Sequence, residues 1–422
     1  MKVRAPCQIL HLDLALDYQF PIRGNRYPSC YQLFWWNHIP LGQLFTQTLD
    51  EKHWVVQVAA AIRPAILEYD QSSIHSNKIL AAWEKGDYPA FVQGMTELFS
   101  GFAQGGPGAS EVSVVICTRN QSAALEGCLE ALQHQQDPPL EILVVDNAPV
   151  DDSTRQLVTK FPGVIYCLEP RAGLDIARNT GVRKSRGRII AYTDDDTRPH
   201  PDWTRALAGA FARKRIMGVT GLVLAARLDT EAQLIFETNW SFNRGFLPMV
   251  YDRHYFNAYR DSAVPVWEIG AGANMALRRE IFHIVGYFDE RLDVGAAGCS
   301  GDSEYWYRIL AEGYEIDYEP RAVVFHDHRR EMQDLRRQIF RYMRGFTTAL
   351  FIQNEKYHHR GNLHHLYRHL PLHYLRMLAL GVRHRFNGRY STIWQEIGGC
   401  LSGIRYYREH RQKAPITEMH PG

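Results

Sequence analysis

The sequence has few cysteines for a chain of 422 residues, and its seven cysteines form no Cys-x-x-Cys pair. An odd number without that motif argues against a disulfide framework or a zinc ribbon and indicates a reducing compartment. Long hydrophobic runs are also missing. The uncharged stretch 27–49 is broken by prolines and Gly42, so it cannot span a bilayer. No apolar run follows MKVRAPC, so we expect no signal peptide and a cytoplasmic protein.

Composition is that of a globular protein, with 45% hydrophobic and 22% charged residues, which excludes extensive disorder. The length suggests two or three domains. Charge is unevenly distributed. Residues 330–422 hold 16 Lys and Arg against 6 Asp and Glu, a net charge of +10, which leaves −8 on residues 1–329. A basic tail behind an acidic body indicates an anionic partner, most simply a phosphate-rich surface.

Changes in composition along the chain predict four regions. Leucines alternate in QILHLDLAL as in a half-buried strand, and residues 76–99 have a helical pattern, so 1–100 is expected to be a small α+β accessory domain. The Gly- and Pro-rich residues 101–110 are expected to be a linker. Residues 111–330 are predicted to form the main domain, and 331–422 a helical, basic C-terminal region.

Residues 111–330 alternate short apolar runs with amphipathic stretches. Strands are predicted at 112–117, 141–146, 164–169 and 188–193, with helices at 123–134, 152–160 and 174–184. This alternation is typical of an α/β domain with a mostly parallel central sheet. Ligands bind such sheets at the carboxyl ends of the strands, where Thr118, Asp146 and Asp194 stand.

The acidic segment Asp194-Asp195-Asp196 follows the fourth predicted strand. Three adjacent carboxylates repel one another unless a cation compensates their charge. Oxygen ligands of this kind suit Mg²⁺ or Mn²⁺ shared with a substrate phosphate. The alternative is a solvated acidic turn before a helix that begins near Trp203.

Six ordered motifs between residues 111 and 328 resemble family 2 glycosyltransferases, which have the GT-A fold, invert the anomeric centre and use nucleotide sugars. The motifs are VSVVICTRN, VVDNAPVDDST, GLDIARNTGV, AYTDDDTRP, GAGANMALRRE and SGDSEYWYRI. The resemblance covers about half of the chain. It implies a metal-dependent, inverting hexosyltransferase with Mn²⁺ or Mg²⁺, a nucleotide-sugar donor for which UDP-sugars are favoured, and a glycan or lipid-linked acceptor in surface polysaccharide or glycoconjugate synthesis.

The resemblance also assigns roles to individual residues. Asp302 would be the catalytic base, although Gly301 stands where the family commonly has Glu. Asp196 and His326 would hold the metal. The donor would be bound by Thr118, Asn120, Asp146, Arg178, Asn179, Asp194 and Asp195, and the acceptor side would include Trp267, Gly270, Gly272 and Glu304.

Several of these residues have a simpler structural interpretation. Asp302 and Glu304 begin a predicted helix, where acids are favoured by the helix dipole alone. His326 and His328 follow an apolar strand and fall on one face of it, as a site or as a structural pair. Trp267 can stack on a sugar or belong to the core.

Other functions remain as alternatives. A dinucleotide-binding motif at Gly270 is rejected because Met275 replaces its third glycine, and the segment lies late in the domain. A nucleotidyltransferase would need a glycine-rich loop after the first strand, which Thr118-Arg-Asn120 does not provide. A catalytically silent nucleotide- or sugar-binding module is the alternative from another class.

The C-terminal region adds one further expectation. Residues 366–382 are apolar with basic residues at intervals, interrupted by Pro371. Such a helix either lies on the anionic inner face of the plasma membrane or packs, solvated, against the main domain. We expect no nucleic-acid partner, because no module for it is present.

Overall fold

In the computed structural model, residues 3–19, 24, 26–47, 51–70, 72–100, 108–259 and 261–411 are described. The chain divides into two compact units. Unit 1 comprises residues 1–105, 225–248 and 327–331, and unit 2 comprises residues 106–224, 249–326 and 332–422. The predicted linker 101–110 falls largely outside the described residues, which resume at Gly108.

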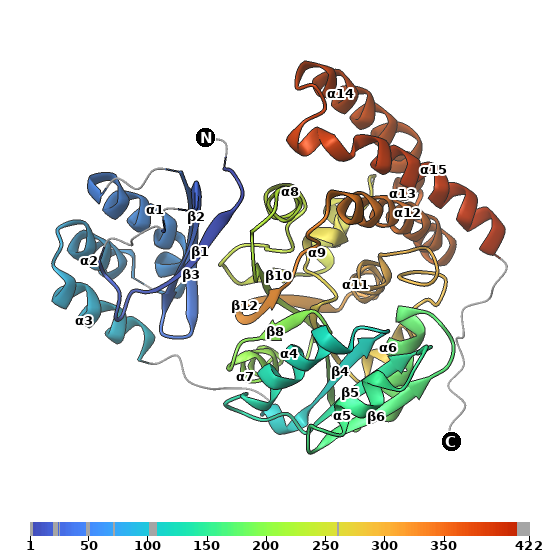
Figure 1. Ribbon diagram of the computed structural model, residues 1–422, viewed down its shortest axis with the longest axis horizontal. Coiled ribbons are helices and arrows are strands. Elements are labelled where there is room, and N and C mark those ends of the chain that lie inside the picture. The colour runs from blue at the N-terminus through green and yellow to red at the C-terminus, as the bar shows by residue number, and fades with distance from the viewer. Residues whose placement is uncertain are drawn as a thin grey trace. The chain divides into compact units, whose positions relative to one another are not determined.

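Unit 1 is a three-stranded sheet with helices. The strands are β1 (Cys7–Asp13), β2 (Ser29–Trp36) and β3 (Ile39–Thr46), in which β1 and β2 are parallel and β2 and β3 antiparallel. Helices α1 (Glu51–Tyr69), α2 (Ser73–Glu84) and α3 (Tyr88–Phe99) cover one face of the sheet (Figure 1). The predicted helical stretch 76–99 is thus two helices, since the chain turns at Gly86 with φ of 74° and restarts with Asp87 as N-cap.

Every residue of β2 is buried, because both faces of this sheet are covered. Phe34 and Trp36 pack into the core with Trp54 and Trp83 of the helices. The opposite face receives α8 (Glu231–Asn239), where Tyr31 donates a hydrogen bond to Glu237 Oε1 at 3.5 Å. A segment more than 200 residues downstream therefore completes unit 1.

The described residues of unit 2 contain a nine-stranded sheet of order β10-β12-β9-β11-β7-β4-β5-β6, with β8 paired to β12. Strands β4, β5, β6 and β7 are parallel, and β11 runs antiparallel to β7 and β9. The sheet is therefore mixed. Its strands are β4 (Val112–Thr118), β5 (Glu141–Asn147), β6 (Val164–Glu169), β7 (Ile189–Asp194), β8 (Thr197–Pro199), β9 (Ile216–Ala225), β10 (Met249–Tyr251), β11 (Asn274–Arg278) and β12 (Glu315–His326).

The parallel half follows the sequence pattern closely. Helices α4, α5 and α6 connect the four parallel strands, and the central residues Val114, Val115 and Ile116 are fully buried, as a strand covered on both faces requires. The helices of this half and of the following chain are η1 (Ala109–Glu111), α4 (Ser122–Gln133), α5 (Ser153–Val158), α6 (Leu174–Lys184), α7 (Trp203–Ala210), α9 (Arg253–Ala258), η2 (Val266–Glu268), α10 (Ile281–Ile284) and α11 (Gly301–Ala311).

The C-terminal part of unit 2 is helical, as predicted. Its long helix α12 packs along α15, and α14 packs against α15 and the short helices beside it (Figure 1). These elements are α12 (Met332–Tyr357), α13 (Arg360–His364), the π-helical turn η3 (His365–His369), α14 (Leu370–Arg383), η4 (Gly388–Thr392) and α15 (Ile393–His410). Among the described residues, no helix combines the length and apolarity needed to cross a bilayer.

Candidate active site

The polar residues predicted for the site lie at one edge of the sheet of unit 2. Thr118 at the end of β4 pairs in register with Asp146 of β5, and the neighbouring Cys117 pairs with Asp194 of β7. Parallel strands end at a common edge, so these side chains converge although they are far apart in sequence.

Asp146 is a buried carboxylate at this edge. Tyr166 donates a hydrogen bond to its Oδ2 at 2.9 Å, whereas Oδ1 has no hydrogen-bond partner among the described residues. Burial raises the pKa of Asp146, and the Tyr166 hydroxyl opposes that shift. A buried acceptor without a donor is costly, so this carboxylate is suited to receive a donor group from a ligand.

Thr118 and Asn120 fix the loops around the strand ends. Thr118 donates a hydrogen bond to Asp195 Oδ2 at 2.6 Å, which connects β4 to the acidic segment after β7. Asn120 has a φ of 56°, and its Oδ1 accepts from the backbone N–H of Val150 at 3.1 Å. Asn is one of the residues that tolerate this left-handed conformation.

Asn179 also has a supporting contact. Its Nδ2 donates to the carbonyl of Phe288 at 3.0 Å, and its Oδ1 accepts from the N–H of Phe288 at 2.9 Å. The side chain therefore anchors the segment before α11 to α6, and this contact orients the loop that carries Asp293.

Asp194, Asp196 and His326 form the group best suited to a metal ion. One ligand atom from each lies within 4.8 Å of the others, and His326 Nε2 is 3.4 Å from Asp196 Oδ1. Burial, followed by the neighbouring Asp196 charge, raises the pKa of Asp194 to about 8. Two carboxylates and an imidazole suit Mn²⁺ or Mg²⁺, and three protein ligands leave positions for phosphate oxygens.

Arg178 is the buried cation of the site. Its Nη1 donates to Asp175 Oδ1 at 2.9 Å and to Asp293 Oδ2 at 2.6 Å. Burial alone would lower the pKa of Arg178, but the surrounding charges of Asp293, Asp175, Asp302 and Asp194 raise it well above its usual value. One guanidinium thus compensates several carboxylates that the low-dielectric interior would otherwise disfavour.

The sequence analysis missed Asp175 and Asp293. Asp175 had a local signal, because it stands three residues before Arg178 on one helical face. Asp293 had none, since it lies 115 residues from Arg178 in a loop and adopts a φ of 64°. Only the fold brings it to the guanidinium.

Asp302 lies beside Arg178, in the first turn of α11. Its Oδ2 accepts from the N–H of Gly272 at 2.7 Å, and its Oδ1 from the N–H of Ser303 at 2.6 Å. Burial raises the pKa of Asp302, with Arg178 opposing the shift. A raised pKa is what a general base working near neutral pH needs.

Two glycines allow this close packing. A Cβ at position 272 would lie 2.6 Å from Arg178 Nη2 and 2.9 Å from Asp302 Oδ2. A Cβ at position 301 would overlap the carboxylate of Asp175. Gly301 stands where the resemblance leads one to expect Glu, and the buried carboxylate of Asp175 occupies the space that a side chain there would need.

Other residues assigned to the acceptor side have structural contacts. Glu304 is fully buried and bonds to Arg308 Nε at 3.0 Å and to Lys356 Nζ at 3.1 Å. Trp267 packs edge-on against Phe346, with ring centroids 5.1 Å apart. A Cβ at Gly270 would approach Thr220. These contacts are thus with residues other than Arg178 and the carboxylates around it, Asp175, Asp293 and Asp302.

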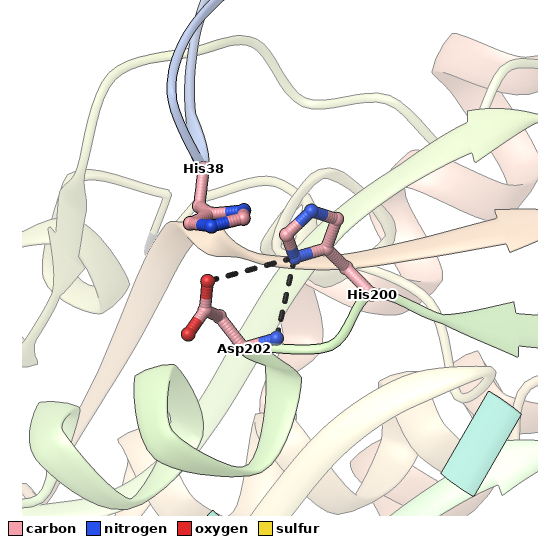
Figure 2. Close-up of side chains that lie close together, drawn as sticks. All are labelled: His38, His200 and Asp202. Carbon is pink, nitrogen blue, oxygen red and sulfur yellow. Dashed lines mark hydrogen bonds and ion pairs between the residues drawn. The ribbon is translucent and has the colours of Figure 1, made fainter. Parts of the chain in front are cut away.

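The two histidines at the C-terminal end of β12, His326 within the strand and His328 just after it, belong to different units. His326 stays with Asp196 in unit 2, whereas His328 belongs to unit 1, where its Nε2 is 2.9 Å from Glu237 Oε2. His328 is therefore a buried partner of α8. The expected helix after the acidic segment begins at Trp203, and His200 Nδ1 accepts from the N–H of Asp202 at 3.3 Å in the turn before it (Figure 2).

The fold and the site define a mixed α/β domain with acidic side chains at the carboxyl edge of its parallel strands. Residues 113–284 match the family described as Glycosyl transferase family 2. The predicted resemblance to this family and the predicted fold class are therefore confirmed for this segment.

Two similar glycosyltransferases have low sequence identity to this chain. The chain is 27% identical over 240 residues to glycosyltransferase AglE of Haloferax volcanii, an alignment covering 56% of this chain and 72% of that protein. It is 26% identical over 234 residues to the pre-mycofactocin glycosyltransferase of Mycobacterium tuberculosis, covering 54% of this chain and 45% of that one.

Among solved structures, the mannosyltransferase PcManGT of Pyrobaculum calidifontis, in complex with GDP-Man and Mn²⁺, aligns with a TM-score of 0.48 and 17% identity. That alignment covers 83% of this chain and 99% of PcManGT.

Proposed function

We propose that this protein is an inverting, metal-dependent glycosyltransferase that moves a hexose from a nucleoside-diphosphate sugar to a glycan or lipid-linked acceptor. The observation that carries the proposal is the position of Asp302. Its buried carboxylate lies beside Arg178, whose charge is also felt by Asp194 of the candidate metal group. The proposed base Asp302 and the proposed diphosphate site at Asp194 thus lie around the same guanidinium, that of Arg178. A single displacement requires the base and the leaving group to be held close to one reacting carbon.

The donor would bind along the carboxyl edge of β4, β5 and β7. Asp146, whose Oδ1 receives no hydrogen bond from the part of the chain that the structure describes, would accept one from the nucleobase. Thr118, Asn120 and Asp195 would keep the loops around the nucleotide in place, and Asn179 would do so from α6. A uracil nucleotide is the first candidate from the family resemblance. Its ring N–H can donate to such a carboxylate, as can the ring N–H of thymine or guanine, so the thermal-shift panel below includes all three.

Mn²⁺ or Mg²⁺ would be held by Asp196 and His326 together with Asp194, whose ligand atoms are close enough for one ion. When bound, the ion would supply positive charge to the departing diphosphate. Arg178 would oppose the rise in the pKa values of the neighbouring carboxylates and would hold Asp175 and Asp293 in position.

Asp302 would take the proton from the acceptor hydroxyl as that oxygen forms a bond to the anomeric carbon. The bond from this carbon to the diphosphate oxygen breaks in the same step, so the configuration inverts without a covalent enzyme intermediate. The main-chain N–H groups of Gly272 and Ser303 hold the two carboxylate oxygens and aim the base.

The acceptor is assigned from the family and from the basic C-terminal region together, which point to surface polysaccharide or glycoconjugate synthesis on the cytoplasmic side. The acceptor side of the site would be supported by Trp267, Gly270 and Glu304 without direct contact with the acceptor. Glu304 has this role because its carboxylate is already bound by Arg308 and Lys356.

A thermal-shift panel of UDP, GDP, CMP and dTDP conjugates, with and without Mn²⁺, tests the proposal. A ligand at 100 times its Kd stabilises the folded state by about 2.7 kcal/mol. We expect a Mn²⁺-dependent rise in melting temperature with one nucleotide class. No shift with any conjugate would contradict the proposal, and a shift without sugar transfer would favour a silent module. Nucleoside triphosphates are included in the same panel, and a shift with these alone would favour a nucleotidyltransferase.

A further inference from the structure

Residues 357–395 of the C-terminal region contain no acidic residue. Six arginines lie in this stretch, at positions 360, 368, 376, 383, 385 and 389. Arg389 is paired with Glu396 of α15. The other five arginines are exposed, and none of them forms an ion pair within the described part of the chain. This part of unit 2 is therefore a concentrated, uncompensated positive surface.

Helix α14 carries an apolar stripe on its outer side. Leu372, Leu375 and Val382 are 59%, 64% and 69% exposed, and Ala379 between them is exposed as well. Their spacing of three, four and three residues places them on one face of the helix. A contiguous row of exposed aliphatic side chains indicates a surface that binds another molecule or a membrane.

The opposite face of α14 is the one that packs on the protein. Tyr374 is buried and donates a hydrogen bond to Glu396 Oε2 at 3.4 Å. Gly381 is buried against Phe386 and Ile393. The helix is thus docked by one side, which leaves the stripe directed away from its own unit.

Basic residues border this stripe. With about 100° of rotation per residue, Arg383 lies about 20° and Arg376 about 40° around the helix axis from Leu372. Both are exposed. Apolar side chains flanked by arginines on one helical face are what an interfacial helix on an anionic membrane presents.

We propose that α14 lies in the surface of a membrane containing anionic lipids, with Leu372, Leu375 and Val382 at the acyl boundary and Arg376 and Arg383 at the headgroup phosphates. This rests on the proposed function in one respect, since a lipid-linked acceptor would be presented at the same surface. The binding itself needs neither donor nor metal.

Two other occupants fit less well. A second copy of this chain would bring the same face to itself in a twofold dimer, so that the arginines beside each stripe would repel one another. A nucleic acid would engage the arginines but leave the aliphatic stripe unused, because Leu and Val do not stack on bases. Lipid satisfies both the charge and the apolar side chains.

Co-sedimentation of the full chain with vesicles tests the proposal, using phosphatidylcholine with and without phosphatidylserine and no nucleotide. We expect binding to the anionic vesicles that weakens with salt. Leu372→Ser/Leu375→Ser and Arg376→Gln/Arg383→Gln should each weaken binding by about tenfold or more. Matched controls are Val56→Ser/Ile74→Ser, which removes equally exposed aliphatic side chains from α1 and α2, and Lys85→Gln/Lys214→Gln.

Failure of the full chain to bind anionic vesicles, or equal losses in the controls, would overturn the proposal. So would concentration-dependent dimerisation that the serine variant abolishes, or binding to duplex DNA that the glutamine variant abolishes, in the absence of vesicle binding. The donor thermal shift is measured on the same variants. If the shift is absent but vesicle binding is present, the proposed activity fails and the membrane surface remains.

Discussion

Arg178 Nη1 and Asp293 Oδ2 are 2.6 Å apart, although 115 residues separate them in the chain. Both side chains are almost completely buried. Asp293 therefore has two effects on the site. It compensates the charge of the guanidinium, and together with Asp175 it holds the same nitrogen, Nη1.

Asp293→Ala should lower the free energy of unfolding by about 1.5–3 kcal/mol, because it removes a buried charge-assisted hydrogen bond to Arg178 while Asp175 still compensates the guanidinium. Urea unfolding of the purified protein measures this. Asp334→Ala, which breaks the exposed pair with Arg337, is the control and should leave the unfolding midpoint unchanged. Equal stability of the Asp293 variant and the wild type would show that Arg178 is held by Asp175 alone.

Asp302→Asn should reduce sugar transfer by about 10²–10⁴-fold while donor affinity is kept, because the amide has the shape of the base without its basicity. Transfer rate and donor thermal shift are measured side by side. Normal transfer by this variant would mean that another group removes the proton.

The rate should also depend on pH through Asp302. Burial raises the pKa of this carboxyl, and only its ionised form accepts a proton. kcat/KM should therefore rise with pH above the usual carboxyl range and level off once Asp302 is ionised. A flat profile through the acid range, with the enzyme still folded, would contradict the assignment.

Asp196→Ala should weaken Mn²⁺ binding by at least about tenfold, since substitutions even outside the ligand shell cost that much. Isothermal titration without nucleotide provides the measurement. Asp151→Ala removes an exposed acid distant from the group in sequence and serves as the control. Equal Mn²⁺ affinity of the Asp196 variant would exclude the group with His326 as the metal site.

Gly301→Ala should destabilise the protein by about 1–3 kcal/mol and reduce transfer, because the added methyl would overlap the Asp175 carboxylate. Gly209→Ala in α7 is matched to it, since nothing lies within 4 Å of the corresponding Cβ. That control should be neutral or stabilise the helix by about 0.5–1 kcal/mol. Identical melting temperatures of both variants would show that Asp175 has room to move.

The local sequence accounts for the parallel half of the sheet. The predicted strand 164–169 is β6 with the same bounds. Strands β4 and β5 each end one residue later than predicted, and β7 both begins and ends one residue later. Strands β4, β5 and β7 were predictable because a strand covered on both faces needs a continuous apolar run. The edge strand β6 has the same apolar pattern although it is only partly buried. The acids that follow them could therefore be located before the fold was known.

Contacts between distant segments were decided by the tertiary structure alone. Residues 225–248 join unit 1 through α8, and His328 turns to Glu237 while His326, two residues earlier, stays with Asp196. Asp293 reaches Arg178 from a loop without any periodic pattern. Periodicity and turn residues report only on neighbours in the chain, whereas burial of a charge depends on what the whole fold places around it. The sequence by itself determined the strands and the acids at their ends, and the packing decided which of those charges are buried together.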